Sequence, residues 1–218
     1  MVARVAIVAI PLLMAVVLHE VAHGAVAYGC GDPTAARAGR LTLNPIAHVD
    51  PVGTIIVPGL LLLTPLLFGG PSFVFGWAKP VPIDPRWFRR PRLDGLLVAL
   101  AGPGTNLVLA AASAVVLGVL ASTGATQGGW GDFLGRLVQQ SIVVNCVLAA
   151  FNLLPIPPLD GGRVLTAVLP DGAARFLAQI EQVGLVVVLL VVMNTGILSR
   201  LVGPLVEACY ALARRVAG

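Results

Sequence analysis

The chain has 218 residues, of which 57% are hydrophobic and only 11% are charged, and its mean hydropathy is +0.94. This composition excludes a soluble globular domain and predicts an integral membrane protein that forms a single domain over residues 1–218. The net charge of +4 does not indicate a nucleic-acid partner, because the basic residues stand between apolar runs and form no basic face with interleaved aromatic residues.

The first apolar run, Val2–Gly29, is long enough to cross a bilayer and contains the pattern HExxH at residues 19–23. Residues four apart on a helix share one face, so His19 and His23 can reach the same ion, while Glu20 borders that face. This placement suits a general base that acts on water at a zinc ion. Residues 1–18 resemble a signal peptide, but cleavage there would detach the motif, so we expect a retained first span.

A single histidine on an apolar face would more often be a structural, hydrogen-bonded residue. Here two histidines and a glutamate share one segment, in a chain with only three histidines. Ionisable groups are costly within a bilayer and normally pair, bind a metal or line a wet cavity. The combination therefore favours zinc.

Further along the chain, three apolar runs have spanning length: Leu93–Ala121, Leu137–Leu154 and Ile180–Leu198. Two shorter runs are ambiguous. Val52–Phe68 contains two prolines, and Leu201–Ala213 is either a sixth crossing or an interfacial helix. We predict an all-α integral membrane protein with five to six transmembrane helices and small re-entrant or β-hairpin elements at the cytoplasmic side.

A catalytic zinc ion usually takes three protein ligands and leaves one position for water. Among the carboxylates, Asp160 is the best candidate for the third ligand. It ends the sequence NLLPIPPLD, whose three prolines prevent a regular helix, and Gly161-Gly162 free the backbone after it. The alternative is that Asp160 only caps the next short helix.

The basic residues predict the orientation in the membrane. If Asp160 is to meet the histidines and Val52–Phe68 is a re-entrant hairpin, then segments 30–51, 69–92, 155–179 and the carboxyl terminus share one side. That side carries 11 of the 14 Lys and Arg residues, so the positive-inside rule makes it cytoplasmic. If Val52–Phe68 crosses instead, either the five-charge loop lies outside or the two metal-bearing spans are antiparallel.

These motifs resemble the site-2 protease family of intramembrane zinc metalloproteases. The likeness rests on HExxH at residues 19–23 and on NLLPIPPLDG at residues 152–161. Three more motifs follow the family's order: Gly39–Pro45 with Asp50-Pro51, Gly76–Pro82 and Ala101–Asn106. The resemblance covers roughly residues 15–165, with no room for the PDZ or CBS modules of some relatives.

The resemblance implies an endopeptidase that binds one Zn²⁺ per chain and hydrolyses peptide bonds within or next to transmembrane segments of protein substrates, as in regulated intramembrane proteolysis. Such an enzyme is a multi-pass protein of the cell membrane with its active site towards the cytoplasm. The implied zinc ligands are His19, His23 and Asp160, the implied catalytic base is Glu20, and Asn106 and Asn152 are implied to contact substrate or order the site.

Other residues receive structural interpretations or remain open. A substrate helix must unwind before cleavage, and the extended segments Arg40–Pro45 and Phe75–Pro82 could pair with its backbone or simply pack at the membrane surface. His48 is interpreted as structural rather than as a fourth ligand. The three cysteines, Cys30, Cys146 and Cys209, have no paired spacing and are interpreted as small apolar residues.

The main functional alternative is a membrane metal-ion transporter or sensor that uses the same His/His/Asp site. Glu20 argues against it, because a transit site needs no base, and so does the lack of a second acidic cluster within the apolar spans. An inactive membrane scaffold is a third reading.

Overall fold

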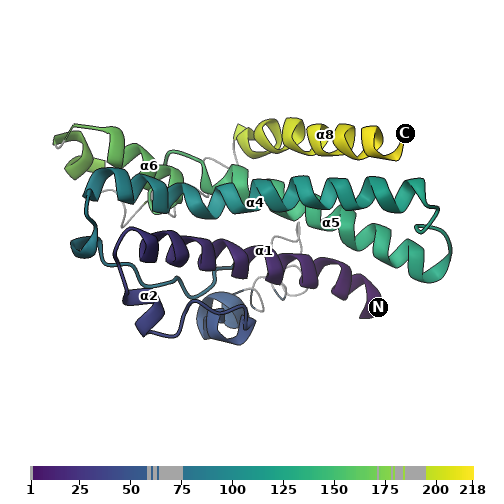
Figure 1. The fold of residues 1–218 in the computed structure, drawn as a ribbon. Helices are drawn as coiled ribbons and strands as arrows, with labels where there is room; N and C mark the ends of the chain where they lie inside the picture. The colour runs from purple at the N-terminus through teal and green to yellow at the C-terminus, as the bar shows by residue number, and fades with distance from the viewer. Residues whose placement is uncertain are drawn as a thin grey trace.

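The computed structural model describes residues 2–57, 60, 63, 76–170, 172–177, 179, 184 and 195–218. Four long helices run alongside one another (Figure 1): α1 (Val2–Gly29), α4 (Pro91–Ser122), α5 (Gly128–Asn152) and α8 (Ile197–Ala217). The shorter elements are α2 (Thr34–Arg37), the 3-10 turns η1 (Pro45–His48) and η3 (Pro85–Trp87), the π-helical turn η2 (Pro51–Ile56) and α6 (Asp160–Val168). The described residues therefore form an all-helical fold, as predicted.

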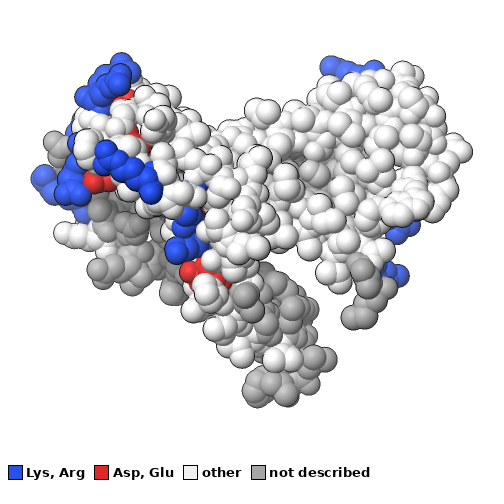
Figure 2. Space-filling model, turned by 60° about the horizontal axis from the view of Figure 1, so that its bottom comes forward, with Lys and Arg blue, Asp and Glu red and all other residues white. Residues whose placement is uncertain are grey.

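Three of the described helices are long and apolar enough to cross a bilayer: Ala3–Gly29, Pro91–Ser122 and Gly128–Asn152. Figure 2 shows charged side chains gathered towards the ends of the molecule, with a broad uncharged surface between them. This distribution is that of a membrane protein. The predicted span 180–198 and the predicted hairpin 52–68 lie largely outside the described residues.

Helix α4 lies at the centre of the bundle and packs against α1, α5, α6 and α8. Small side chains allow this close approach, as is usual between helices in membranes. Ala110 and Ala114 are buried against Ile142 of α5. At Gly118, an added Cβ would lie 2.5 Å from the backbone oxygen of Ala213 in α8. The bundle is thus held by close contact between backbones.

The position of the carboxyl terminus differs from the predicted topology. Helix α8 starts at Ile197, which packs on Leu154 and Leu159, and it reaches Gly118 of α4 through Ala213. Both termini consequently lie at the same end of the bundle (Figure 1), away from the loop at 30–51. The reason is that residues 197–217 form one continuous helix along α4. Removing its two terminal arginines leaves 9 of the 14 basic residues, 11 minus 2, in the three predicted cytoplasmic segments.

The predicted extended segments at 40–45 and 76–82 form no β-strand in the described residues, and Phe75 lies outside them. They are instead joined to neighbouring turns by isolated backbone bonds. The Trp77 N–H donates to Gly53 O at 3.1 Å, and the Lys79 N–H donates to His48 O at 2.9 Å. Pro80 and Pro82 lack the N–H groups that a regular ladder needs.

Candidate metal centre and active site

The three predicted zinc ligands converge on one point within the bundle. His19 and His23 lie on one face of α1, and Asp160 is the first residue of α6. The Nε2 atoms of the two histidines are 3.0 Å apart, and Asp160 Oδ2 lies 3.1 Å from His19 Nε2 and 3.2 Å from His23 Nε2. All three side chains are buried.

The other nitrogen of each imidazole has a hydrogen-bond acceptor that orients the ring. His23 Nδ1 lies 2.6 Å from the carbonyl oxygen of Val98, and His19 Nδ1 lies 2.6 Å from Oδ1 of Asn106. Both oxygens can only accept, so both Nδ1 atoms carry the proton in the neutral imidazoles and both Nε2 atoms are acceptors. Two nitrogen lone pairs and a carboxylate oxygen thus face one another, an arrangement that requires a cation between them.

The donor set and its spacing fit a zinc ion. Nitrogen and oxygen ligands about 2.0–2.1 Å from a tetrahedral zinc lie about 3.3 Å from one another, close to the observed separations. Gly102 of α4 leaves the space open, since an added Cβ would lie 2.4 Å from His23 Nε2 and 2.5 Å from His19 Nε2. Any side chain at position 102 would therefore fill the centre.

Two adjacent glycines allow α6 to bring Asp160 to the histidines. An added Cβ on Gly161 would lie 2.4 Å from the backbone oxygens of Leu153 and Leu154, and one on Gly162 would lie 2.5 Å from the backbone nitrogen of Pro157. The glycines are needed for this close approach rather than for an unusual backbone angle. Leu159 occupies the N-cap position of α6 and Asp160 is the first helical residue, so Asp160 is not the cap of this helix.

An aspartate carboxyl group is ordinarily ionised at neutral pH, and a nearby cation favours the ionised form. Arg163, one turn along α6, lies 3.8 Å away from Asp160 Oδ1. The group that faces the histidines is therefore a carboxylate, which is the form that binds metals.

Glu20 lies beside this cluster, and its orientation is fixed by the backbone of the segment at 76–84. Its Oε2 accepts a hydrogen bond of 2.8 Å from the Val81 N–H. Val81 is buried, and its side chain packs near Gly24 of α1. Arg40 anchors the same segment, because its Nη2 donates to Lys79 O at 2.7 Å.

The cluster opens into a cavity of about 780 Å³. Its walls include the His19, Glu20, His23 and Asp160 side chains, together with Pro80, Val81, Asn152 and Arg163. The carboxylate of Glu20 and the ligand cluster therefore face the same space.

The two asparagines named with the site occupy different places. Asn106 has no exposed surface, and its Nδ2 donates to Asn145 Oδ1 at 2.8 Å and to Ala15 O at 3.3 Å. A side chain so enclosed does not face the cavity, so of the two predicted roles only ordering of the site stays open. Asn152 lines the cavity, where its Nδ2 donates to Leu148 O at 3.0 Å.

Sequence reasoning underrated two contributions from α4. The motif Ala101–Asn106 entered the sequence analysis only as part of the family resemblance, whereas Gly102 gives the imidazoles their space and Val98 supplies a carbonyl oxygen to His23. The glycine could be seen in the sequence, but the side chains for which it leaves space depend on how α1 packs against α4. His48 is buried with its Nε2 2.9 Å from Thr42 O, outside the ligand cluster.

Several known proteins are similar to this chain in sequence. The sequence profile of "Peptidase family M50" matches residues 129–194. "Putative zinc metalloprotease YwhC" of Bacillus subtilis (strain 168) is 40% identical over 200 residues, which cover 91% of this chain and 85% of that protein. The chain belongs to peptidase family M50, the site-2 protease family.

Two longer M50 relatives carry the name "Putative zinc metalloprotease Rip2". The protein of Mycolicibacterium smegmatis (strain ATCC 700084 / mc(2)155) is 32% identical over 195 residues, 85% of this chain and 66% of its own length. That of Mycobacterium tuberculosis (strain ATCC 25618 / H37Rv) is 31% identical over 177 residues, 81% of this chain and 62% of its own length. No solved structure matches the chain.

Proposed function

We propose that this M50 peptidase is an intramembrane zinc endopeptidase that hydrolyses peptide bonds within or next to the transmembrane segments of other proteins. The observation that carries the proposal is the meeting of three buried acceptor atoms with a neighbouring glutamate in one cavity. Two candidate spans, α1 and α4, form the walls at that point, so a bond cleaved there lies at membrane depth.

In this mechanism, Nε2 of His19, Nε2 of His23 and Oδ2 of Asp160 would hold the zinc ion. When bound there, zinc supplies Lewis-acid chemistry, which polarises a scissile carbonyl and activates water. Glu20 takes a proton from the attacking water and delivers it to the leaving amine. The Val81 N–H keeps the Glu20 carboxylate in place for both transfers.

The remaining groups hold the ligands in position. Asn106 and the Val98 carbonyl oxygen keep both imidazoles in the tautomer that presents Nε2. Asn152 lines the cavity wall, which supports a role for it in contacting the backbone of the substrate. A substrate helix must unwind to expose its carbonyl groups, and the irregular segment at 76–82 offers backbone groups with which it can pair.

The distribution of basic residues supports an active site that opens towards the cytoplasm. The sequence segments 30–51, 69–92 and 155–179, which follow or precede the helices that bear the metal centre, carry 9 of the 14 Lys and Arg residues. The positive-inside rule assigns such loops to the cytoplasmic side of the cell membrane. Cleavage at this depth would release a cytoplasmic fragment, as regulated intramembrane proteolysis requires.

Replacing the general base tests the proposal. Purified protein should cleave a model single-span substrate, and Glu20→Gln should retain zinc while cleavage falls by about 10²- to 10⁴-fold. Glu207→Gln, at an exposed position on α8, serves as the matched control and should cleave normally. Undiminished proteolysis by Glu20→Gln would refute the assigned base. Residue-dependent metal uptake into vesicles without peptide hydrolysis would favour a transporter instead.

A further inference from the structure

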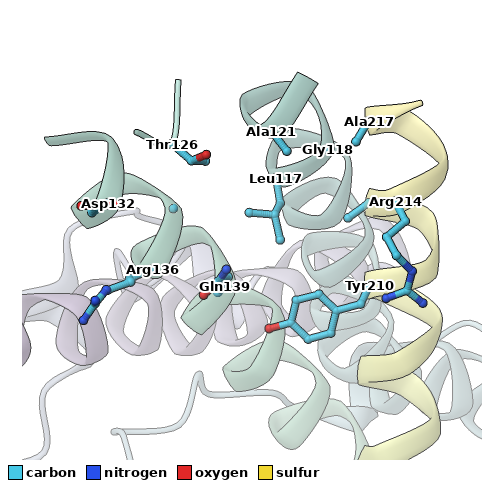
Figure 3. Close-up of a pocket in the computed structure, with 12 residues that line it drawn as sticks. Leu117, Gly118, Ala121, Thr126, Asp132, Arg136, Gln139, Tyr210, Arg214 and Ala217 are labelled. Atoms are coloured by element: carbon cyan, nitrogen blue, oxygen red, sulfur yellow. The ribbon is translucent and has the colours of Figure 1, made fainter. Parts of the chain in front are cut away.

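A second polar site lies at the opposite end of the bundle, next to both chain termini. One cavity of about 420 Å³ lies between α4, α5 and α8, and another of about 440 Å³ adjoins it between α1, α5 and α8. Both are lined by Arg136, Gln139 and Tyr210. Figure 3 shows Tyr210 extending from α8 towards Gln139 of α5. We call this pair of cavities the terminal crevice.

The terminal crevice is strongly basic. Arg4, Arg136 and Arg214 line it, and Asp132 is the one acidic side chain among its lining residues, which gives a net charge of +2 from three positive groups and one negative group. No ion pair joins these arginines to a carboxylate within the part of the chain that the structure describes. Three arginines without anionic partners around one crevice predict an anionic ligand.

The depth of the crevice matches that of lipid phosphates. Helix α5 has 25 residues, whereas about 20 residues cross the hydrocarbon. A crossing of that length that ends at Asn152 begins close to Phe133, one turn before Arg136, so Arg136 lies at the boundary between hydrocarbon and headgroups. Trp130, which is 85% exposed, stands at the level where aromatic residues anchor membrane proteins.

The lining of the crevice changes from polar to apolar along the helices. In the second cavity, Arg4 and Arg136 are followed towards the middle of the bundle by Ile7 of α1 and by Val143 of α5. Polar groups at the end and apolar groups below them match a phosphate headgroup followed by an acyl chain. A free phosphate would use only the polar end.

We propose that the terminal crevice binds the headgroup of an anionic phospholipid from the leaflet next to the chain termini. Arg4 and Arg136 contact the phosphate, Tyr210 and Gln139 supply hydrogen bonds, and Ile7 and Val143 contact the upper acyl chain. Arg214, on the other side of Tyr210 (Figure 3), adds to the positive potential without touching the phosphate. The net charge of the lining favours an anionic lipid over a zwitterionic one, because the latter would bring its own cation against the arginines.

A lipid titration tests this site. The full chain, purified in mild detergent, is titrated with fluorescently labelled phosphatidylglycerol and, in parallel, with labelled phosphatidylcholine. We expect tighter binding of phosphatidylglycerol, weakened about fivefold by Arg136→Gln and again by Arg4→Gln, with a smaller loss in Arg214→Gln. Arg136→Lys should retain most of the affinity, and Arg215→Gln, a neighbouring exposed arginine outside the lining, should retain all of it.

Each other outcome decides against the proposal. Equal losses in Arg215→Gln and Arg136→Gln would show a diffuse charge effect and no site. Displacement of the labelled lipid by inorganic phosphate as readily as by unlabelled phosphatidylglycerol would show a free-anion site. Displacement by an acidic peptide but not by phosphatidylglycerol vesicles would assign the crevice to a protein partner. Melting curves establish that the variants are folded.

Discussion

The polar side chains at the two ends of the bundle differ in their burial and in their partners. At the metal centre, His19, His23 and Asp160 are buried and held within about 3 Å of one another by partners on three helices. At the terminal crevice, Arg136 and Arg214 are exposed and held by no carboxylate in the described residues. The first arrangement suits chemistry that needs fixed atoms, and the second suits a reversible electrostatic contact.

The largest difference between the two ends should follow from removing a ligand. Asp160→Ala leaves two imidazoles without the carboxylate that completes the cluster, so zinc content should fall to background and proteolysis should cease. Elemental analysis and substrate cleavage measure the two effects. Glu207→Ala is the control and should keep both. Full zinc occupancy in Asp160→Ala would show that another residue is the third ligand.

A steric change at the centre should have the next largest effect. Gly102→Ala places a methyl group about 2.5 Å from both Nε2 atoms, so we expect zinc affinity to fall more than about 100-fold. Gly104→Ala is a matched control on the same helix, because nothing lies within 4 Å of its added Cβ. Competition with a chromogenic chelator measures the affinities, and equal values for the two variants would rule out the assigned role of Gly102.

Loss of a supporting hydrogen bond should have a smaller effect. Asn106→Leu removes the acceptor of the His19 Nδ1 proton, and zinc affinity or activity should drop by about 10- to 100-fold. Ser113→Ala removes a bond from α4 to Ser141 of α5 and should cost about 0.6 kcal/mol of stability without changing zinc affinity. If the two variants bind zinc alike, Asn106 does not orient the ligand.

Loss of the backbone hydrogen bond to the general base Glu20 should have a still smaller effect on activity. Val81→Pro removes the N–H that donates to Glu20, while Val81→Ala keeps it. We expect kcat to fall about tenfold in Val81→Pro relative to Val81→Ala, as for a hydrogen bond of about 1.5 kcal/mol to a charged group. Zinc content should be equal in both. Steady-state kinetics decide this, and identical kcat values would remove Val81 from the mechanism.

The smallest effect on the metal should come from the other end of the molecule. Arg214→Gln changes the terminal crevice but touches nothing at the metal centre, so its zinc content should equal that of the unaltered chain. Metal analysis of the purified variant checks this. A loss of zinc would mean that the two ends are coupled through α4 and α8. The metal centre and the terminal crevice would then not be independent.

Local sequence patterns were sufficient to predict the features that lie within a single helix. The span Val2–Gly29 matches α1, and HExxH placed two imidazoles on one face because the α-helical repeat brings residues four apart together. Helix α5 starts at Gly128, earlier than the predicted Leu137, because polar residues such as Asp132 and Arg136 interrupt the apolar pattern without interrupting the backbone hydrogen bonds.

What the sequence by itself determined is the membrane class, the zinc motif and the candidate ligand Asp160, since these depend on composition and short spacing. Only the tertiary structure decided that Gly102 makes room for the imidazoles, that Asn106 is enclosed rather than facing substrate, and that the carboxyl terminus lies beside the amino terminus. Each of these depends on how helices far apart in the chain dock together, and small-residue packing in a bilayer leaves little trace in a single sequence.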